Sequence, residues 1–231
     1  MSTFARIGAT AAALAGGALF LGGRLGVSEA ARPATVPSPT IDASLAVASS
    51  TDTVVFAGGC FWGVQAVFEH VKGVKSAVSG YAGGHVRSPS YEEVSTGTTG
   101  HAESVQVIFD PSQITFGKLL EIFFSVAHDP TEKDRQGPDV GTQYRSAVFY
   151  RTAEQRRITE SYIAQLTRAK VYPHPIVTEV SHLDAFYPAE AYHQHYAMLH
   201  PDSPYIATYD LPKVAALEAR YPDLYREPVT N

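Results

Sequence analysis

The only cysteine of this 231-residue chain, Cys60, follows two glycines and lies two positions before the only tryptophan. The residues over 53–56 are typical of a strand, and apolar residues over 61–71 recur at helical spacing. This pattern places Cys60 at a strand-to-helix turn, where free backbone N–H groups and the helix dipole favour an anion. We therefore expect a lowered pKa for the thiol and more of the nucleophilic thiolate. The pattern fits a small, buried, unreactive cysteine equally well.

Two long segments without regular periodicity, residues 88–103 and 128–144, carry further polar side chains. Connections of this length in compact domains are usually functional or disordered. Their aromatic, acidic and glycine content argues against disorder, so we expect them to contribute to a functional site. The side chains concerned are Tyr91, His101, Glu103, Asp129, Asp139 and Tyr144.

The elements that must position these residues alternate along the chain. Strands are predicted over 54–56, 75–81, 104–109, 146–150 and 176–183, and helices over 60–71, 116–127 and 153–169. This alternation predicts an α/β (α+β) fold, a two-layer sandwich with a mixed β-sheet core and packed helices. The sheet should be mixed because the second and third strands have no predicted helix between them. The strand over 176–183 is expected to be the last core strand.

The first fifty residues have the composition of a targeting region. Residues 1–30 form a predicted signal peptide, with Arg6, an uncharged apolar run and a small-x-small site ending at Ala30. An uncleaved membrane anchor is the alternative. Residues 31–50, rich in Pro, Ala, Ser and Thr, are predicted to be a flexible tether. Residues 51–231 then form one domain, exported to a bacterial periplasm or secreted.

The charge and the cysteine count exclude several classes of protein. The formal net charge is −5, and removal of residues 1–30 (Arg6, Arg24 and Glu29) makes it 16 − 22 = −6. A mildly acidic chain without a basic tract is a poor candidate for binding nucleic acid. One cysteine allows neither an internal disulfide nor a multi-cysteine zinc site. His193 and His195 are badly spaced for sharing a metal on a helix, so no metal is expected.

Together, five segments of the sequence give a specific resemblance. They are Gly-Cys-Phe-Trp-Gly (59–63), Gly-Tyr-Ala-Gly-Gly (80–84), Tyr-Glu-Glu-Val leading to Thr-Gly-His-Ala-Glu (91–103), His-Asp-Pro-Thr with the run from Arg135 to Ser146 (128–146), and Ala-Glu-Ala-Tyr-His-Gln-His-Tyr (189–196). In this order they resemble the peptide methionine sulfoxide reductase A family. The resemblance favours a reactive Cys60 and implies that residues 51–231 are the catalytic domain of a peptide-methionine (S)-S-oxide reductase.

The resemblance assigns the nucleophile to Cys60 and the proton donor to Glu103. Reduction of a sulfoxide needs a soft nucleophile at sulfur and a proton for the oxygen. Glu103 is a credible acid only if burial raises its pKa so that it holds a proton near neutral pH. Taken alone, Glu103 is more typical of a solvated carboxylate at a strand end.

Further site residues follow from the same motifs. Phe61 and Trp62 resemble the apolar wall for the S-methyl group, although both also suit the core. Tyr91 and Tyr144 resemble the hydroxyls that hold the sulfoxide oxygen. Asp139 resembles a residue that orients groups or polarises the substrate amide, and a turn aspartate is the alternative. The remaining two, His193 and Tyr196, resemble site-lining residues and are spaced for one helical face, although a structural histidine is nearly as plausible.

The predicted cycle leaves Cys60 as a sulfenic acid. Many family members carry further cysteines that resolve this intermediate, but this chain has none, and Ser95 stands where some relatives have cysteine. The resemblance therefore implies recycling by an external thiol, a thioredoxin-like protein or a small dithiol, with no other cofactor. Its substrates would be oxidised proteins and peptides and free methionine sulfoxide, and the chain is expected to be a monomer.

Two competing functions remain open at this point. A protein that binds oxidised methionine, or that records oxidant exposure as Cys60 sulfenic acid without turnover, is favoured by the missing resolving cysteine. A thiol hydrolase would need a histidine base beside Cys60. The combination of Glu103, Tyr91 and Tyr144 favours the reductase.

Overall fold

The computed structural model describes residues 36–228. The predicted signal peptide lies outside these residues. The strands are β1 (Asp52–Gly58), β2 (Val74–Ala82), β3 (Ala102–Phe109), β4 (Arg135–Gln136), β5 (Asp139–Val140), β6 (Ser146–Tyr150), β7 (Glu179–His182) and β8 (Phe186–Pro188). The α-helices are α1 (Phe61–Glu69), α2 (Tyr91–Ser95), α3 (Phe116–Ile122), α4 (Ala153–Arg168), α5 (Tyr196–Leu199) and α6 (Leu211–Arg220). Short 3₁₀ and π-helical turns are η1 (Phe123–Ala127), η2 (Thr142–Tyr144), η3 (Ala191–His193) and η4 (Ile206–Asp210).

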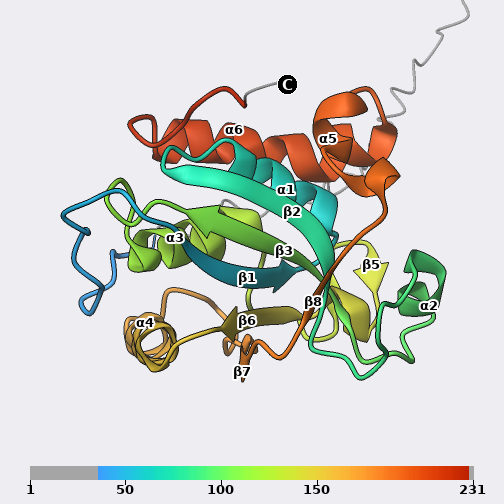
Figure 1. The fold of residues 1–231 in the computed structure, drawn as a ribbon, viewed down its shortest axis with the longest axis horizontal. Helices are drawn as coiled ribbons and strands as arrows, with labels where there is room; N and C mark the ends of the chain where they lie inside the picture. The colour runs from blue at the N-terminus through green and yellow to red at the C-terminus, as the bar shows by residue number, and fades with distance from the viewer. Residues whose placement is uncertain (1–35, 229–231) are drawn as a thin grey trace, which may run out of the picture. The chain divides into compact units, whose positions relative to one another are not determined.

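Six strands form one sheet in the order β7-β6-β1-β3-β2-β8, and β4 and β5 form a separate hairpin (Figure 1). The pairing of β6 with β7 is parallel, and the other pairs in the sheet are antiparallel. The predicted mixed sheet is confirmed. Its central strand, β1, pairs with β3 on one side and with β6 on the other, so both of its edges are satisfied.

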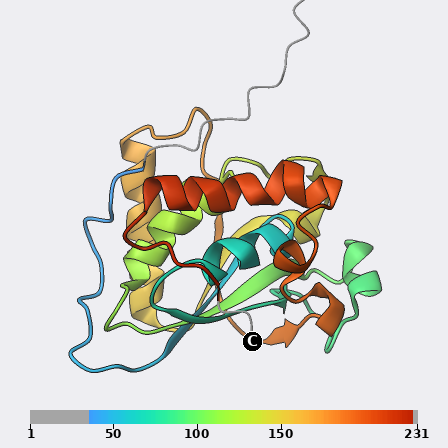
Figure 2. The same ribbon diagram turned by 90° about the horizontal axis from the view of Figure 1, so that it is seen from above.

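The helices pack on one face of the sheet, which makes the predicted two-layer arrangement (Figure 2). Val54 and Phe56 of β1 join a large buried cluster with residues of α1, α3, α4 and α6. Val55 and Ala57 point to the opposite face, where they pack in a smaller cluster with Phe149. Because both faces of β1 are buried, its sequence is an almost continuous apolar run rather than an alternating one.

The turn that carries Cys60 is formed as predicted. Strand β1 ends at Gly58, and Cys60 is the residue that precedes the first turn of α1. Gly59 between them has φ +88, a conformation that favours glycine, and a Cβ there would lie 2.5 Å from the side chain of Gln136. The absence of a side chain at Gly59 thus allows the chain to turn tightly against Gln136 immediately before the thiol.

Two sequence predictions differ from the structure, and the short polar helices were not predicted. The helix predicted over 116–127 divides into α3 and the π-helical turn η1. The strand predicted over 176–183 is the short edge strand β7, which is not the last one, because β8 follows and pairs with β2. Short polar helices such as α2, which begins with a capping box from Ser90 to Glu93, lack the apolar stripe used for prediction.

The described part of the predicted tether, residues 36–50, contacts the domain. The hydroxyl of Tyr162 donates to the Pro37 carbonyl at 2.8 Å, and Asp42 accepts hydrogen bonds from the Thr115 hydroxyl and the Gly117 N–H at the start of α3. This segment is therefore docked rather than free. Its composition did not predict these contacts, because single polar side chains supply them. None of the helices in residues 36–228 is long and apolar enough to cross a membrane.

Candidate active site

The Cys60 side chain is 8% exposed and lies at the N-terminus of α1. Burial raises its pKa well above the usual value, and the nearby carboxyl groups of Glu103 and Asp210 raise it further. A hydrogen bond from the Trp62 backbone N–H lowers the pKa, as the helix-start position predicted, but this effect is outweighed. The prediction of a lowered thiol pKa is therefore wrong for the free protein. The sequence pattern identified the helix terminus but not the side chains that exclude water from it.

Glu103 lies near the start of β3, paired with Tyr81 of β2. The residue is 3% exposed, and its carboxyl group accepts a hydrogen bond of 3.0 Å from the Phe61 N–H. Burial raises its pKa to about 8, against the lowering effect of that hydrogen bond, and the charges of Asp139 and Asp210 add to the increase. Glu103 therefore holds a proton at pH 7. The condition under which it was predicted to serve as an acid is met.

Two tyrosines approach the thiol and the carboxyl group from separate segments. Tyr91 begins α2, and its backbone N–H donates to Glu190 at 2.9 Å. Tyr144 ends the turn η2. Burial raises the pKa of both phenols, and the charges of Glu103 and Cys60 raise them further. Both hydroxyls consequently remain protonated and can donate to an oxygen placed between them and Cys60.

An aromatic cluster surrounds the start of α1. Trp62 stacks on Tyr196, with ring centroids 3.9 Å apart, and its indole N–H donates to His193 Nδ1 at 3.2 Å. Phe61 is fully buried and contacts the His193 ring at 5.1 Å, so it belongs both to the core and to the edge of the site. Because Nδ1 of His193 accepts the hydrogen bond from the indole N–H, the neutral imidazole carries its proton on Nε2, which is buried and has no partner in the described region.

His193 and Tyr196 lie close together, but not on one helical face, as their spacing of three residues had predicted. His193 ends the 3₁₀ turn η3, and Tyr196 begins α5, while His195 between them has φ +57. The two residues are therefore not on one face of a continuous helix. They meet because both pack against Trp62.

Sequence reasoning missed Tyr205. Its hydroxyl donates to the carboxylate of Asp139, and its ring meets Trp62 edge to face at 6.1 Å. Asp139 lies in β5, so this contact joins the β4–β5 hairpin to the C-terminal part of the chain. The chain has 13 tyrosines, and no local sequence pattern distinguishes Tyr205 from the others. Its contact with Asp139 joins two segments that are far apart in the sequence.

Asp210 and Lys213 were also missed. The Asp210 side chain is completely buried and forms an ion pair of 3.1 Å with Lys213 Nζ. A Cβ on Gly63 of α1 would lie 2.1 Å from Asp210 Oδ1, so the absence of a side chain there admits the pair beside the helix that follows Cys60. Lys213 lowers the pKa of the Cys60 thiol and Asp210 raises it.

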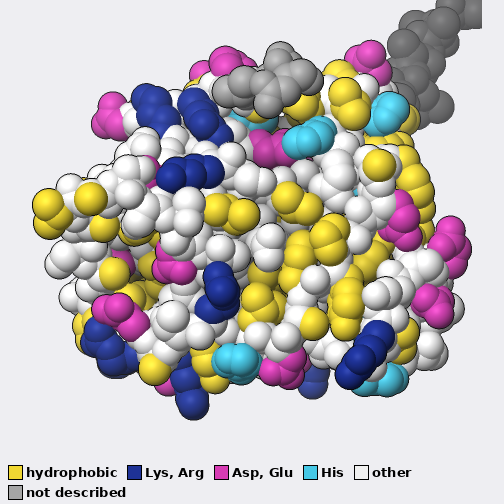
Figure 3. Space-filling view, in the orientation of Figure 1, with side chains coloured by type: hydrophobic (Ala, Val, Ile, Leu, Met, Phe, Trp, Pro, Cys, Tyr) yellow, Lys and Arg dark blue, Asp and Glu magenta, His cyan; other side chains and the backbone are white. Residues whose placement is uncertain are grey.

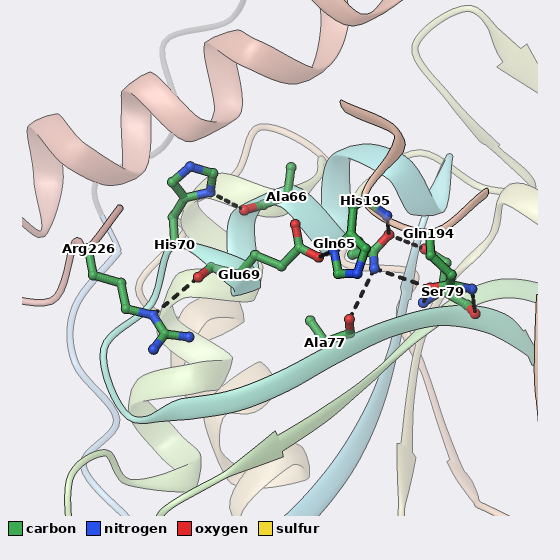
Figure 4. A network of polar contacts seen from close by, with 9 residues as sticks. All are labelled: Gln65, Ala66, Glu69, His70, Ala77, Ser79, Gln194, His195 and Arg226. Atoms are coloured by element: carbon green, nitrogen blue, oxygen red, sulfur yellow. Dashed lines mark hydrogen bonds and ion pairs between the residues drawn. The ribbon is translucent and has the colours of Figure 1, made fainter. Parts of the chain in front are cut away.

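A buried polar network fixes the segment that carries His193 and Tyr196 (Figure 4). The Gln194 amide accepts from the Ser79 N–H at 3.0 Å and donates to the Ser79 carbonyl at 2.9 Å. It also accepts from Gln65 Nε2 at 3.2 Å. Gln194 therefore binds the edge of β2 and helix α1 at once, and α1 is the helix that begins beside Cys60.

Gln194→Leu is expected to destabilise the domain by about 1–3 kcal/mol, because the buried Ser79 N–H loses the side-chain oxygen that accepts its hydrogen bond. The melting temperature should fall by several degrees, and KM for a methionine sulfoxide peptide should rise as His193 shifts. Gln113→Leu is the matched control, since Gln113 is exposed and makes a single side-chain hydrogen bond to Asp110. Equal melting temperatures for the two variants would contradict a positioning role for Gln194.

The assembled site can deliver a proton to an oxygen atom while the sulfur of Cys60 attacks the atom that carries this oxygen. Glu103, Tyr91 and Tyr144 supply three O–H donors around Cys60, beside a wall of aromatic rings. Within residues 36–228, no group of three or more His, Cys, Asp or Glu side chains is placed to hold a metal ion.

Comparison with known proteins agrees with this chemistry. A family model described as peptide methionine sulfoxide reductase matches residues 52–223. The chain is 57% identical over 180 residues to peptide methionine sulfoxide reductase MsrA 2 of Mesorhizobium japonicum, covering 78% of this chain and 92% of that protein. It is 49% identical over 175 residues to peptide methionine sulfoxide reductase MsrA of Thermus thermophilus, covering 76% and 98%.

Solved structures show a similar fold. Methionine sulfoxide reductase A of Corynebacterium diphtheriae matches with a TM-score of 0.57 at 36% identity, over 72% of this chain and 84% of that one. Reduced Mxr1 from Saccharomyces cerevisiae matches with a TM-score of 0.61 at 30% identity, over 71% and 92%. The predicted fold class and the resemblance of the five segments are confirmed, and the chain belongs to the peptide methionine sulfoxide reductase family of oxidoreductases.

Proposed function

We propose that this protein reduces the S epimer of methionine sulfoxide, in polypeptides and as the free amino acid, to methionine. The observation that carries the proposal is the buried side chain of Glu103, which accepts a hydrogen bond from the Phe61 N–H next to the single thiol and whose pKa burial raises to about 8. The Cys60 sulfur attacks the sulfoxide sulfur while Glu103 donates a proton to the oxygen, which Tyr91 and Tyr144 hold by hydrogen bonds. The family resemblance supports the choice of epimer, since each reductase class handles one.

The atoms and electrons of this step balance. The sulfoxide sulfur gains two electrons and loses its oxygen, and the Cys60 sulfur loses two electrons and becomes a sulfenic acid. The thiol proton and the sulfoxide oxygen both end on Cys60, and Glu103 regains its proton. The wall formed by Phe61 and Trp62 receives the S-methyl group, and the rings of His193 and Tyr196 pack against Trp62. The family resemblance supports a role for Asp139, whose carboxylate accepts a hydrogen bond from the Tyr205 hydroxyl, in orienting groups or polarising the substrate amide.

Cys60 has no second cysteine to resolve the sulfenic acid. An external thiol, from a thioredoxin-like protein or a small dithiol, condenses with it to a mixed disulfide and releases water. A second thiol then restores Cys60 and leaves with the first as a disulfide. No other cofactor takes part. The protein acts as a monomer, because one set of side chains from a single chain completes the site.

The test is a single-turnover assay without reductant. Protein starting at residue 31 is mixed with the separate S and R epimers of a methionine sulfoxide peptide, beside Cys60→Ser. We expect about one methionine per protein from the S epimer only, a sulfenic acid on Cys60, and none from the variant. Binding without methionine formation would sink the proposal and favour a protein that only recognises oxidised methionine. Multiple turnovers without any added thiol would contradict the recycling step.

We also propose that the chain is exported, from the composition of residues 1–30. Expression of the full chain in a bacterium with a periplasm should give a mature protein that begins at Ala31, measured by mass spectrometry of the periplasmic fraction. Full-length chain in the membrane fraction would indicate an uncleaved anchor. Full-length chain in the cytosol would contradict export.

A further inference from the structure

The backbone turns sharply between His193 and Tyr196, the two residues whose rings pack against Trp62. Gln194 is extended, with φ −73 and ψ 137, and His195 is left-handed, with φ +57 and ψ 21. Residues other than glycine adopt a left-handed conformation infrequently, so contacts outside the turn must favour it here. The orientation of both rings toward Trp62 depends on this turn.

Helix α1 contacts His195 at two points. The side-chain oxygen of Gln65 accepts a hydrogen bond of 3.1 Å from the His195 N–H. Nδ1 of the His195 ring and Oε1 of Glu69 share a hydrogen bond of 2.6 Å (Figure 4). Gln65 and Glu69 are four residues apart, and Trp62 precedes Gln65 by three, so the three side chains lie on one side of α1. That side of the helix therefore holds both His195 and the rings that flank it in the sequence.

The contact between His195 and Glu69 depends on the hydrogen bond rather than on close packing. The Glu69 side chain is 9% exposed, whereas the His195 side chain is 53% exposed and borders a cavity of about 260 Å³. Figure 3 shows histidine, acidic and basic side chains close together in the region where Figure 1 places β2 and α1. Within residues 36–228, no other side chain hydrogen-bonds the Glu69 carboxyl group, and Arg226 donates to the Glu69 backbone carbonyl instead. The His195 ring can thus move into the cavity once the hydrogen bond is lost.

We propose that His195 and Glu69 are positioning residues, whose hydrogen bond fixes the turn on α1 and so holds the rings of His193 and Tyr196 against Trp62. Glu69 ends α1, roughly 13 Å along the helix axis from Cys60, so it acts through these rings and not on the reacting atoms. The expected effect on substrate binding rests on the proposed function, whereas the effect on Trp62 does not.

The fluorescence of Trp62 tests the proposal directly, because this residue is the only tryptophan of the chain. Glu69→Leu removes the hydrogen bond and keeps a side chain of similar size in the buried position. His195→Gly removes the ring and retains the left-handed backbone, which glycine adopts readily. In both variants we expect emission at a longer wavelength and stronger quenching by acrylamide, because the Tyr196 ring no longer covers the indole.

Single turnover of a methionine S-sulfoxide peptide, without reductant, separates substrate binding from the reaction. In both variants the peptide concentration that gives half the maximal rate should rise about fivefold, as for the loss of one hydrogen bond. The maximal rate should stay within about twofold of wild type, because the reacting groups are unchanged.

Two further variants serve as controls. Glu69→Gln can still share a hydrogen bond with the His195 ring, so its emission and its dependence on peptide concentration should match wild type. His182→Asn should also behave as wild type. It removes an exposed histidine of β7 that pairs with the carboxylate of Asp184 at 3.0 Å, away from α1.

The possible outcomes are distinct. Wild-type emission and peptide dependence in both Glu69→Leu and His195→Gly would overturn the proposal. A loss in Glu69→Gln as large as in Glu69→Leu would overturn it too, because the hydrogen bond is kept there. Altered emission with normal peptide dependence would uphold the positioning of the rings and contradict their part in substrate binding. If the wild-type protein itself reduced no sulfoxide, the proposed function would be wrong, and the fluorescence would still decide the positioning role.

Discussion

Glu103→Gln is expected to lower kcat by a factor of about 10² to 10⁴, the range typical for loss of a general acid. Glutamine keeps the size of the side chain and can still accept the hydrogen bond from the Phe61 N–H, which is 3.0 Å long in the wild type. It cannot release a proton to the sulfoxide oxygen. The defect should appear in single turnover with the S epimer, where thiol recycling plays no part.

The protonation states of Glu103 and Cys60 also determine how kcat/KM should change with pH. Below the pKa of about 8, Glu103 and the Cys60 thiol both hold their protons. The reactive pair, a Cys60 thiolate beside a protonated Glu103, holds one proton fewer than this state. Therefore kcat/KM should rise with pH to a maximum above about 8 and fall once both groups are ionised.

In Glu103→Gln, the falling part of the profile should disappear, because only the thiol titrates. The thiol should also ionise at a lower pH than in wild type, since the charge of Glu103 raises the pKa of Cys60. The rate of alkylation of Cys60 by iodoacetamide, measured against pH, reports this directly. Glu103→Asp, which keeps an acid, should retain a bell-shaped profile. A wild-type profile that falls steadily from pH 6 would contradict the assignment of the two protonation states.

The sequence predicts the part of the site that depends on local pattern. The two glycines before Cys60 and the apolar spacing after it locate the turn, because a strand, a tight turn and a helix each have a short-range signal. The burial of Glu103 is compatible with its apolar neighbours but needs the fold to establish it. Tyr91 and Tyr144 could be selected only through the motifs, since nothing in the sequence pattern itself distinguishes two tyrosines among 13.

The thiol pKa shows why the remaining part could not be predicted. Helix position lowers it, whereas burial, Glu103 and Asp210 raise it. These groups come from β3 and η4, and their separation from Cys60 is set by the packing of the whole domain. The same applies to the contact between Tyr205 and Asp139 and to the edge position of β7. Patterns of a few residues carry no information on such distances.

Removal of either member of the Asp210–Lys213 pair should destabilise the domain. The two removals should, however, shift the pKa of the Cys60 thiol in opposite directions. Lys213→Met leaves a fully buried carboxyl group without its cation, at a cost of about 3–5 kcal/mol and a fall in melting temperature of about 10 °C. Asp210→Asn should cost about 1–3 kcal/mol, because the buried amide keeps few partners. Lys72→Met is the matched control, since Lys72 is exposed and its side chain meets only a carbonyl.

The thiol separates an electrostatic effect from simple loss of structure. Lys213 lowers the pKa of Cys60, so Lys213→Met should slow its alkylation near pH 8, by about threefold or more. Asp210 raises that pKa, so Asp210→Asn should speed alkylation by a similar factor. The double variant should return the rate toward wild type. If both single variants changed the alkylation rate of Cys60 in the same direction, general disruption of the site would explain both changes. The pair would then have no specific influence on the pKa of Cys60. Opposite shifts would show that a buried ion pair, supplied by the C-terminal part of the chain, sets how readily the thiol becomes a nucleophile.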